Sequence, residues 1–146
     1  MNTIMKNFLA VFIGLLLGGV VNMGLIIGGS SIIPPPAGVD VTSSESIAAA
    51  MELFTARHFI FPFLAHALGT LVGAVIAYLV AASQNLKLAY LIGALFLLGG
   101  ISNVFLIPAP LWFIVLDLVA AYIPMAWLGI FIAVKLKPAR VAEETG

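Results

Sequence analysis

Cysteine is absent from this chain of 146 residues. Its absence excludes disulfide bonds, thiol nucleophiles and thiolate metal sites, and it leaves the redox compartment open. Charged side chains are also scarce, at 8% of the residues, and the formal net charge is zero. The chain therefore has no basic surface of the kind that binds nucleic acid, and we expect no nucleic-acid partner.

Apolar residues are correspondingly abundant in this chain. They make up 63% of the chain, and the mean hydropathy is +1.23, which leaves too little polar surface for a water-soluble domain. The apolar runs are continuous and do not alternate, so they indicate helices and exclude barrel strands. Crossing a bilayer takes about 20 helical residues. We therefore predict an all-α polytopic membrane protein, a single integral membrane domain over 1–146, with transmembrane helices at about 8–29, 59–82, 88–107 and 111–134.

The basic residues predict the orientation of these helices. Lys6 precedes the first apolar run, which is too long for a signal peptide and lacks a convincing cleavage site, so we interpret it as a retained helix. Only Arg57 lies on the opposite side from the remaining basic residues. The positive-inside rule then places both termini, with the tail 135–146, in the cytoplasm, and locates the protein in the plasma (bacterial inner) membrane. The basic residues on the cytoplasmic side are Lys6, Lys87, Lys135, Lys137 and Arg140.

The loop at about 30–57 is predicted to lie outside and to contain a short extracytoplasmic helix. Pro34-Pro35-Pro36 makes its first part extended and stiff. Thr42-Ser43-Ser44-Glu45 matches a capping box, which predicts a helix start near Ser43, and 44–57 has good helix formers without a breaker. Pro62 then either kinks one long helix or divides this outer helix from the second span.

A segment that occurs twice suggests an internal repeat. Residues 16–27 read LLGGVVNMGLII, and residues 97–108 read LLGGISNVFLIP. The glycine pairs match, and Asn22 matches Asn103. Because the first and third spans run in the same direction, we interpret the chain as a 2+2 parallel repeat about an axis along the membrane normal. The matching register of the second and fourth spans sets His66 opposite Asp117.

Four polar residues on four spans predict a shared pocket: Asn22, His66, Asn103 and Asp117. At 1.5 Å per residue, all four lie roughly 6–11 Å below the outer surface. Asp117 is the only carboxylate inside a span, and such groups normally face a bundle interior and take a partner, for which His66 is the natural candidate. The pocket is predicted to bind a ligand or a proton. The alternatives are that the asparagines are interhelical hydrogen-bond glue and that His66 and Asp117 form a purely structural pair.

Three further polar residues are predicted at the outer mouth of this pocket: Glu52, Arg57 and His58. Glu45, Glu52 and His66 recur every seven residues, so they would share one stripe if a single helix continued through Pro62.

The predicted function is binding or transport of a small solute or ion, with proton coupling through His66 and Asp117. Four helices make a thin pathway, so a homodimer is expected in addition to the lipid bilayer as partner. One alternative is a non-catalytic subunit or assembly partner of a larger membrane complex, because small residues form exposed stripes that suit a foreign helix.

A membrane-embedded metal enzyme is the other alternative. Its candidate ligands are His58, His66 and Asp117, which would suit zinc or iron. However, the two histidines lie about 80° apart on a helix, which is a poorer arrangement than the i, i+4 spacing of recognised sites. The chain also lacks an HExxH motif, a nucleophile motif and a phosphate loop, so the sequence favours the other two functions over an enzyme and leaves the enzyme as an open alternative.

Overall fold

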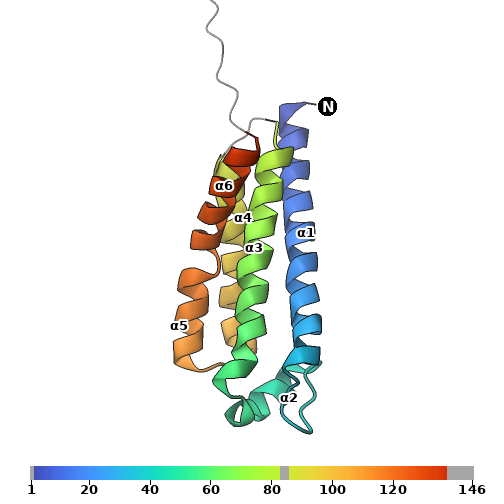
Figure 1. The fold of residues 1–146 in the computed structure, drawn as a ribbon, viewed down its shortest axis with the longest axis vertical. Helices are drawn as coiled ribbons and strands as arrows, with labels where there is room; N and C mark the ends of the chain where they lie inside the picture. The colour runs from blue at the N-terminus through green and yellow to red at the C-terminus, as the bar shows by residue number, and fades with distance from the viewer. Residues whose placement is uncertain (1, 83–85, 138–146) are drawn as a thin grey trace, which may run out of the picture.

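Four long helices make up most of this computed structural model, which describes residues 2–82 and 86–137. Each of these four segments within the described ranges is long and apolar enough to cross a membrane. They lie side by side, and the predicted all-helical fold with four such helices is confirmed (Figure 1). The segments are Thr3–Ile32 (α1), Ala56–Val80 (η2, Ala56–Phe59, and α3, Ile60–Val80), Leu86–Leu106 (α4) and Leu111–Leu136 (α5, Leu111–Ala120, and α6, Ile123–Leu136).

α1 is longer than the sequence indicated. It begins at Thr3 because the Asn2 side chain caps it, accepting the Met5 backbone N–H at 2.8 Å. It ends at Ile32, shortly before Pro34, since a run of prolines cannot continue a helix. A cap and a stop outside the apolar run therefore extend the helix at both ends.

The predicted helix in the connecting loop is present but short. α2 (Ser44–Ala49) begins near Ser43, as predicted, but the predicted capping box is not formed. The cap is the Ser43 hydroxyl, which accepts the Ser46 N–H at 3.3 Å, whereas the Thr42 hydroxyl donates to Asp40. α2 does not continue to Arg57. A single turn, η1 (Met51–Leu53), follows, and η2 then starts a new segment with Thr55 as its own cap. The break occurs because Thr55 and its side chain compete with the helix for local hydrogen bonds.

Pro62 neither kinks a long helix nor divides an outer helix from the span. It lies in the first turn of α3, where a missing N–H costs no intrahelical hydrogen bond. The chain instead breaks upstream, around Thr55. Because α2, η1 and η2 are separate elements, Glu45, Glu52 and His66 do not lie on one continuous helix.

The fourth span, expected as one helix over 111–134, is divided into α5 and α6. Pro124 lies in the first turn of α6; it has no N–H to continue the α5 ladder, and its ring would clash with the preceding turn. Ala121 N–H still bonds to the Asp117 carbonyl at 2.9 Å, and α6 restarts with Ala126 N–H bonding to the Tyr122 carbonyl at 2.8 Å. The interruption falls between Ala120 and Ile123, well inside the apolar segment.

The bundle has two halves, which we name by their ends. The α2 half is the half nearer α2, and the terminal half is the half nearer the start of α1 and the end of α6 (Figure 1). In the terminal half, α3 packs tightly on its neighbours through small residues. A methyl group added at Gly14 of α1 would lie 2.7 Å from the Gly73 carbonyl oxygen of α3, so only glycine allows this approach. The buried core there comprises Ala74, Ala77, Tyr78, Ala89, Ile92, Ala126, Ile130 and Ala133.

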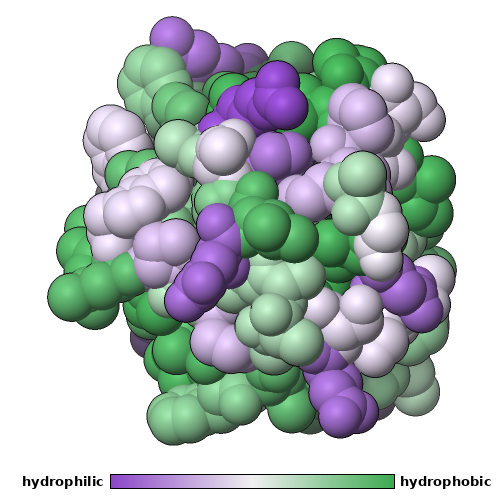
Figure 2. Space-filling model, turned by 90° about the horizontal axis from the view of Figure 1, so that it is seen from below, coloured by the Kyte–Doolittle hydropathy of each residue, from purple (hydrophilic) through white to green (hydrophobic). Residues whose placement is uncertain are grey.

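The outside of the bundle is largely apolar. Phe105 is 84% exposed, and Phe8, Ile60 and Trp127 are also exposed, so all four segments present large hydrophobic side chains outward. A surface of this kind suits lipid and not water. Seen from the α2 end, hydrophilic residues are interspersed among hydrophobic ones (Figure 2).

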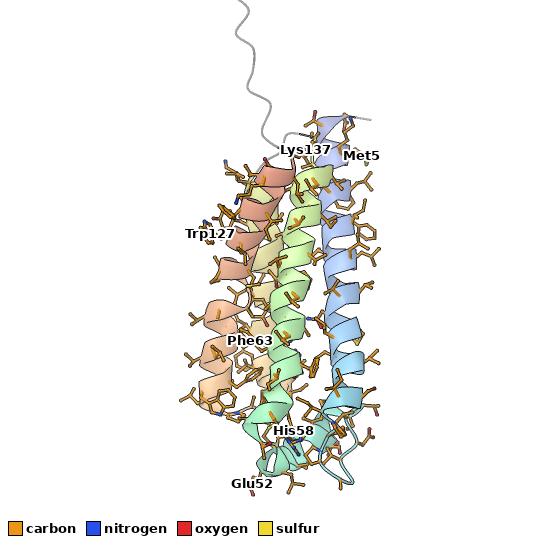
Figure 3. The ribbon with its side chains drawn as sticks, in the orientation of Figure 1. Met5, Glu52, His58, Phe63, Trp127 and Lys137 are labelled. Carbon is orange, nitrogen blue, oxygen red and sulfur yellow. The ribbon has the colours of Figure 1, made fainter. Side chains whose placement is uncertain are left out.

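The lysines gather at the end of the terminal half. There the Asn7 side chain accepts the Ala82 N–H at 3.1 Å, Lys137 donates to the Leu79 carbonyl at 3.0 Å, and Lys135 lies 4.0 Å from the centre of the Phe131 ring. Met5 and Lys137 mark this end, whereas Glu52 and His58 mark the other (Figure 3). Arg140, also assigned to this group from the sequence, lies outside the described residues.

Candidate functional site

The centre of the candidate site is the buried carboxylate of Asp117 on α5. His66 Nδ1 lies 2.9 Å from both carboxylate oxygens, and the Tyr122 hydroxyl donates to Oδ2 at 2.9 Å. The pairing of His66 with Asp117 predicted from the sequence is therefore present. Asp117 joins the second span to the fourth, and its two donors satisfy the hydrogen-bonding needs of a carboxylate in an apolar interior.

Tyr122 belongs to the site but was missed by the sequence analysis. The interruption of the fourth span lets it turn back onto Asp117, which precedes it in the same segment. Its ring occupies the space beside Gly100 of α4, where an added methyl group would lie 2.6 Å from the ring carbon Cζ. The sequence carried one usable signal, a tyrosine two residues before Pro124 and five residues after a carboxylate inside an apolar segment.

His66 is held from several directions. The Tyr122 ring stacks against its imidazole with centroids 5.8 Å apart, and the Thr70 hydroxyl donates to the His66 carbonyl at 2.7 Å. The His66 side chain is 16% exposed, compared with 7% for Asp117. Within the described part of the chain, its second ring nitrogen, Nε2, has no hydrogen-bond partner, and no fully buried side-chain polar atom lacks one. Nε2 therefore opens to the surface.

Asn22 of α1 lies one helical turn from His66 along the bundle. It packs against Gly69 of α3, where an added methyl group would lie 3.1 Å from the Asn22 Cβ. Gly69 and His66 share a face of α3 because they are three residues apart. The Asn22 side chain is half-buried, and no described residue forms a hydrogen bond with its amide. It contacts α3 but does not act as hydrogen-bond glue there.

Asn103 lies on the same face of α4 as two residues that pack against other helices. Phe96, Gly100 and Asn103 share one helical face, and the first two contact other helices. Asn103 itself is exposed, and its amide has no hydrogen-bond partner among residues 2–82 and 86–137. On this face of α4, Phe96 and Gly100 are covered by neighbouring helices, whereas the Asn103 amide is not.

The two copies of the repeated segment face the bundle differently. Gly18 packs against the Gly69 carbonyl, whereas its counterpart Gly99 has nothing within 4 Å. Conversely, Gly19 is open and its counterpart Gly100 is closed by Tyr122. The packed glycine is therefore the first of the pair in one copy and the second in the other. The inward-facing sides of the two copies thus differ by one residue, or about 100° around the helix axis.

The residues expected at the mouth do not form one cluster with His66. His58 Nδ1 accepts the Thr55 N–H at 2.9 Å and so acts as a cap of η2. Glu52 lines an open hollow with Gly38 and Ser46 in the α2 loop, and Arg57 is exposed on η2. Both Glu52 and His58 lie at the α2 end (Figure 3). No group of three or more metal-ligating His, Cys, Asp or Glu residues occurs among the described residues, so His58, His66 and Asp117 do not form one metal centre.

Comparison with known proteins adds no relatives. No protein-family model matches the chain, and searches of the curated proteins and of the solved structures give no significant match. Any function must therefore be argued from the site itself.

The site chemistry is that of a carboxylate-oriented imidazole. The Asp117 carboxylate holds one ring nitrogen of His66, Nδ1, and so orients the imidazole with the other nitrogen, Nε2, toward the surface. Nε2, the Asn22 amide and the Asn103 amide come from α3, α1 and α4, helices that contact one another. These groups are able to accept or donate hydrogen bonds to a bound species.

Proposed function

We propose that this protein spans a membrane and binds or transports a small polar solute or ion at a site made of His66, Asn22 and Asn103. Support comes from one observation above all: all three side chains offer polar groups without a partner among the described residues. Placing a polar group in hydrocarbon without a hydrogen-bond partner raises the free energy of the folded protein by roughly several kcal/mol. Water or a ligand in this half of the bundle would supply the missing partners.

The lysines support the proposed orientation. Lys6, Lys87, Lys135 and Lys137 lie at the end of the terminal half, and Arg57 lies at the other end. By the positive-inside rule, the terminal half faces the cytoplasm and the α2 half faces outward, in a plasma membrane. In this orientation the site is reached from outside the cell. Proton coupling through His66 and Asp117 remains part of the proposal.

A second function, as a subunit of a larger membrane complex, is favoured by a different feature. Gly19, Gly24 and Gly28 of α1 have nothing within 4 Å, and the last two have the small-xxx-small spacing that lets another helix approach closely. Such a face suits a second copy of this chain or a foreign helix.

Native mass spectrometry with elemental analysis distinguishes the two functions. We would compare the protein purified in mild detergent with an Asp117→Asn/His66→Ala double variant. Solute binding predicts a bound small molecule or ion that is lost in the variant. Subunit function predicts that both proteins carry no small ligand and retain foreign subunits, a result that would overturn the first proposal.

A further inference from the structure

The backbone hydrogen bonding of the fourth span is interrupted between Ala121 and Tyr122. On the α5 side, the Ala121 N–H bonds to the Asp117 carbonyl at 2.9 Å. On the α6 side, the Ala126 N–H bonds to the Tyr122 carbonyl at 2.8 Å, and Pro124 has no N–H to donate. Among the described residues of this span, no backbone hydrogen bond joins the part before the interruption to the part after it. The backbone therefore resists bending less here than in a continuous helix.

Among the described residues, one side-chain hydrogen bond crosses this interruption. The Tyr122 hydroxyl donates to Asp117 Oδ2 at 2.9 Å. The same carboxyl group lies 2.9 Å from His66 Nδ1, so it connects α5 to α3 as well as to the start of α6. The Tyr122 ring is itself held, because it stacks on His66 with centroids 5.8 Å apart and lies against Gly100 of α4. We call the three side chains of His66, Asp117 and Tyr122 the polar latch.

The other attachment of α5 to the bundle is apolar. α5 lies at the edge of the bundle (Figure 1), and Phe113 and Asp117 are its two buried residues. The Phe113 ring contacts the Phe59 ring of η2, with centroids 4.7 Å apart. Lipid is as apolar as these rings and can replace their contact, whereas it cannot replace a hydrogen bond. The polar latch therefore restrains α5 more strongly than Phe113 does. The remaining large apolar side chains of α5 that are exposed are Leu111, Trp112, Val115, Leu116 and Val119.

We propose that α5 is a hinged segment that turns about residues 121 and 122, and that the polar latch holds it against α3. Outward rotation separates Asp117 from His66 and brings water to the carboxyl group, which needs new partners in place of those it leaves. The same rotation frees the His66 imidazole, whose Nε2 belongs to the proposed solute site. The motion requires no solute, so only its effect on Nε2 rests on the proposed function.

The test measures distances between pairs of nitroxide labels by double electron–electron resonance, in the full-length protein in nanodiscs without added solute. The natural chain has no cysteine, so the labels attach to introduced ones. Leu111→Cys at the start of α5 is paired with Phe12→Cys on α1, and the control pair is Ile60→Cys at the start of α3 with Phe12→Cys; all three positions are exposed. Tyr122→Phe keeps the ring and removes the hydroxyl. We expect the fraction of molecules with a second 12–111 distance to rise by about tenfold, the effect of losing one hydrogen bond to the carboxyl group. The 12–60 distance should not change.

Two further variants show whether the polar latch is what holds α5. Tyr90→Phe removes a tyrosine hydroxyl elsewhere, on α4, and should leave both distances unchanged. Phe113→Leu weakens the contact with Phe59 and should change the fraction by less than about twofold, because lipid replaces that contact. An unchanged 12–111 distance in Tyr122→Phe overturns the inference. An equal response to Tyr90→Phe or Phe113→Leu, or a change in the 12–60 distance, does so as well. None of these results bears on ligand binding, which the mass spectrometry measures separately.

Discussion

The two halves of the bundle differ in how large a buried core their helices form. In the terminal half, glycine and alanine bring α3 close to α1, α4 and α6, and a continuous core results. In the α2 half, α5 replaces α6, and of its residues only Phe113 and Asp117 are buried. The difference shows that small residues allow the helices of this bundle to pack closely. Near Asn22, His66 and Asn103, polar groups remain without a partner among the described residues.

The largest expected effect comes from removing one partner of the polar pair. His66→Leu leaves the Asp117 carboxylate without its ionisable partner and should lower the free energy of unfolding by about 3–5 kcal/mol. Unfolding by sodium dodecyl sulfate, followed by circular dichroism, measures the loss. The His66→Leu/Asp117→Asn variant removes the charge and keeps an acceptor for Tyr122, so it should recover most of the stability. Equal instability of the two variants would refute this account of the α2 half.

The next effect tests the close packing of the terminal half. Gly14→Val places a side chain against the Gly73 carbonyl and Ala77, so we expect a loss of about 2–3 kcal/mol from overpacking. The matched control is Gly19→Val on the same helix, where nothing lies within 4 Å. The same unfolding assay should show almost no change for the control. A similar loss for both variants would mean that α1 does not pack as described.

A smaller effect is expected where α4 meets the polar site. Gly100→Ala overlaps the buried Tyr122 ring, so the tyrosine must shift and weaken its hydrogen bond to Asp117, at a cost of about 1–2 kcal/mol. Gly99→Ala is the matched control because nothing lies within 4 Å of that glycine. The two variants also test whether the repeat is exact. If it were, Gly99 would be packed as its counterpart Gly18 is, and Gly99→Ala would be the more destabilising variant.

The smallest effect is a pH dependence confined to the loop before α2. The Thr42 hydroxyl and then the Thr42 backbone N–H donate to Asp40 and hold the pKa of its carboxyl below the ordinary 3.8. Because the folded pKa is lower than the unfolded one, this stabilisation is present above 3.8 and is lost as the pH falls through the folded value. Hydrogen exchange should show faster opening of this loop at low pH. Thr42→Val removes the hydroxyl donor but keeps the backbone N–H, so it should weaken that pH dependence. An equal acceleration of hydrogen exchange in the terminal half at low pH would contradict the assignment of this effect to Asp40.

Much of this architecture follows from the sequence, and the exceptions have physical causes. Hydropathy predicts the four long helices because bilayer thickness fixes their length. The pairing of His66 with Asp117 was predictable because a carboxylate among apolar residues needs a partner. Tyr122 was not, since its place depends on a helix interruption that only Pro124 signals. The local cap that His58 forms with Thr55 was not indicated by the sequence pattern, because it depends on the break in the helix before η2. The helical faces of the repeat were unpredictable, as sequence identity does not determine which side of a helix packs inward.

The most direct test asks whether water reaches the α2 half along α4. The natural chain has no cysteine, so single substitutions can be labelled without background. Asn103→Cys and Phe105→Cys both replace exposed residues near the same end of α4, and Phe105 is 84% exposed. With a charged, membrane-impermeant thiol reagent applied from the α2 side in intact vesicles, we expect Cys labelling at position 103 and none at 105. Equal labelling at both positions, or none at either, would contradict a water-accessible polar site in this half of the bundle.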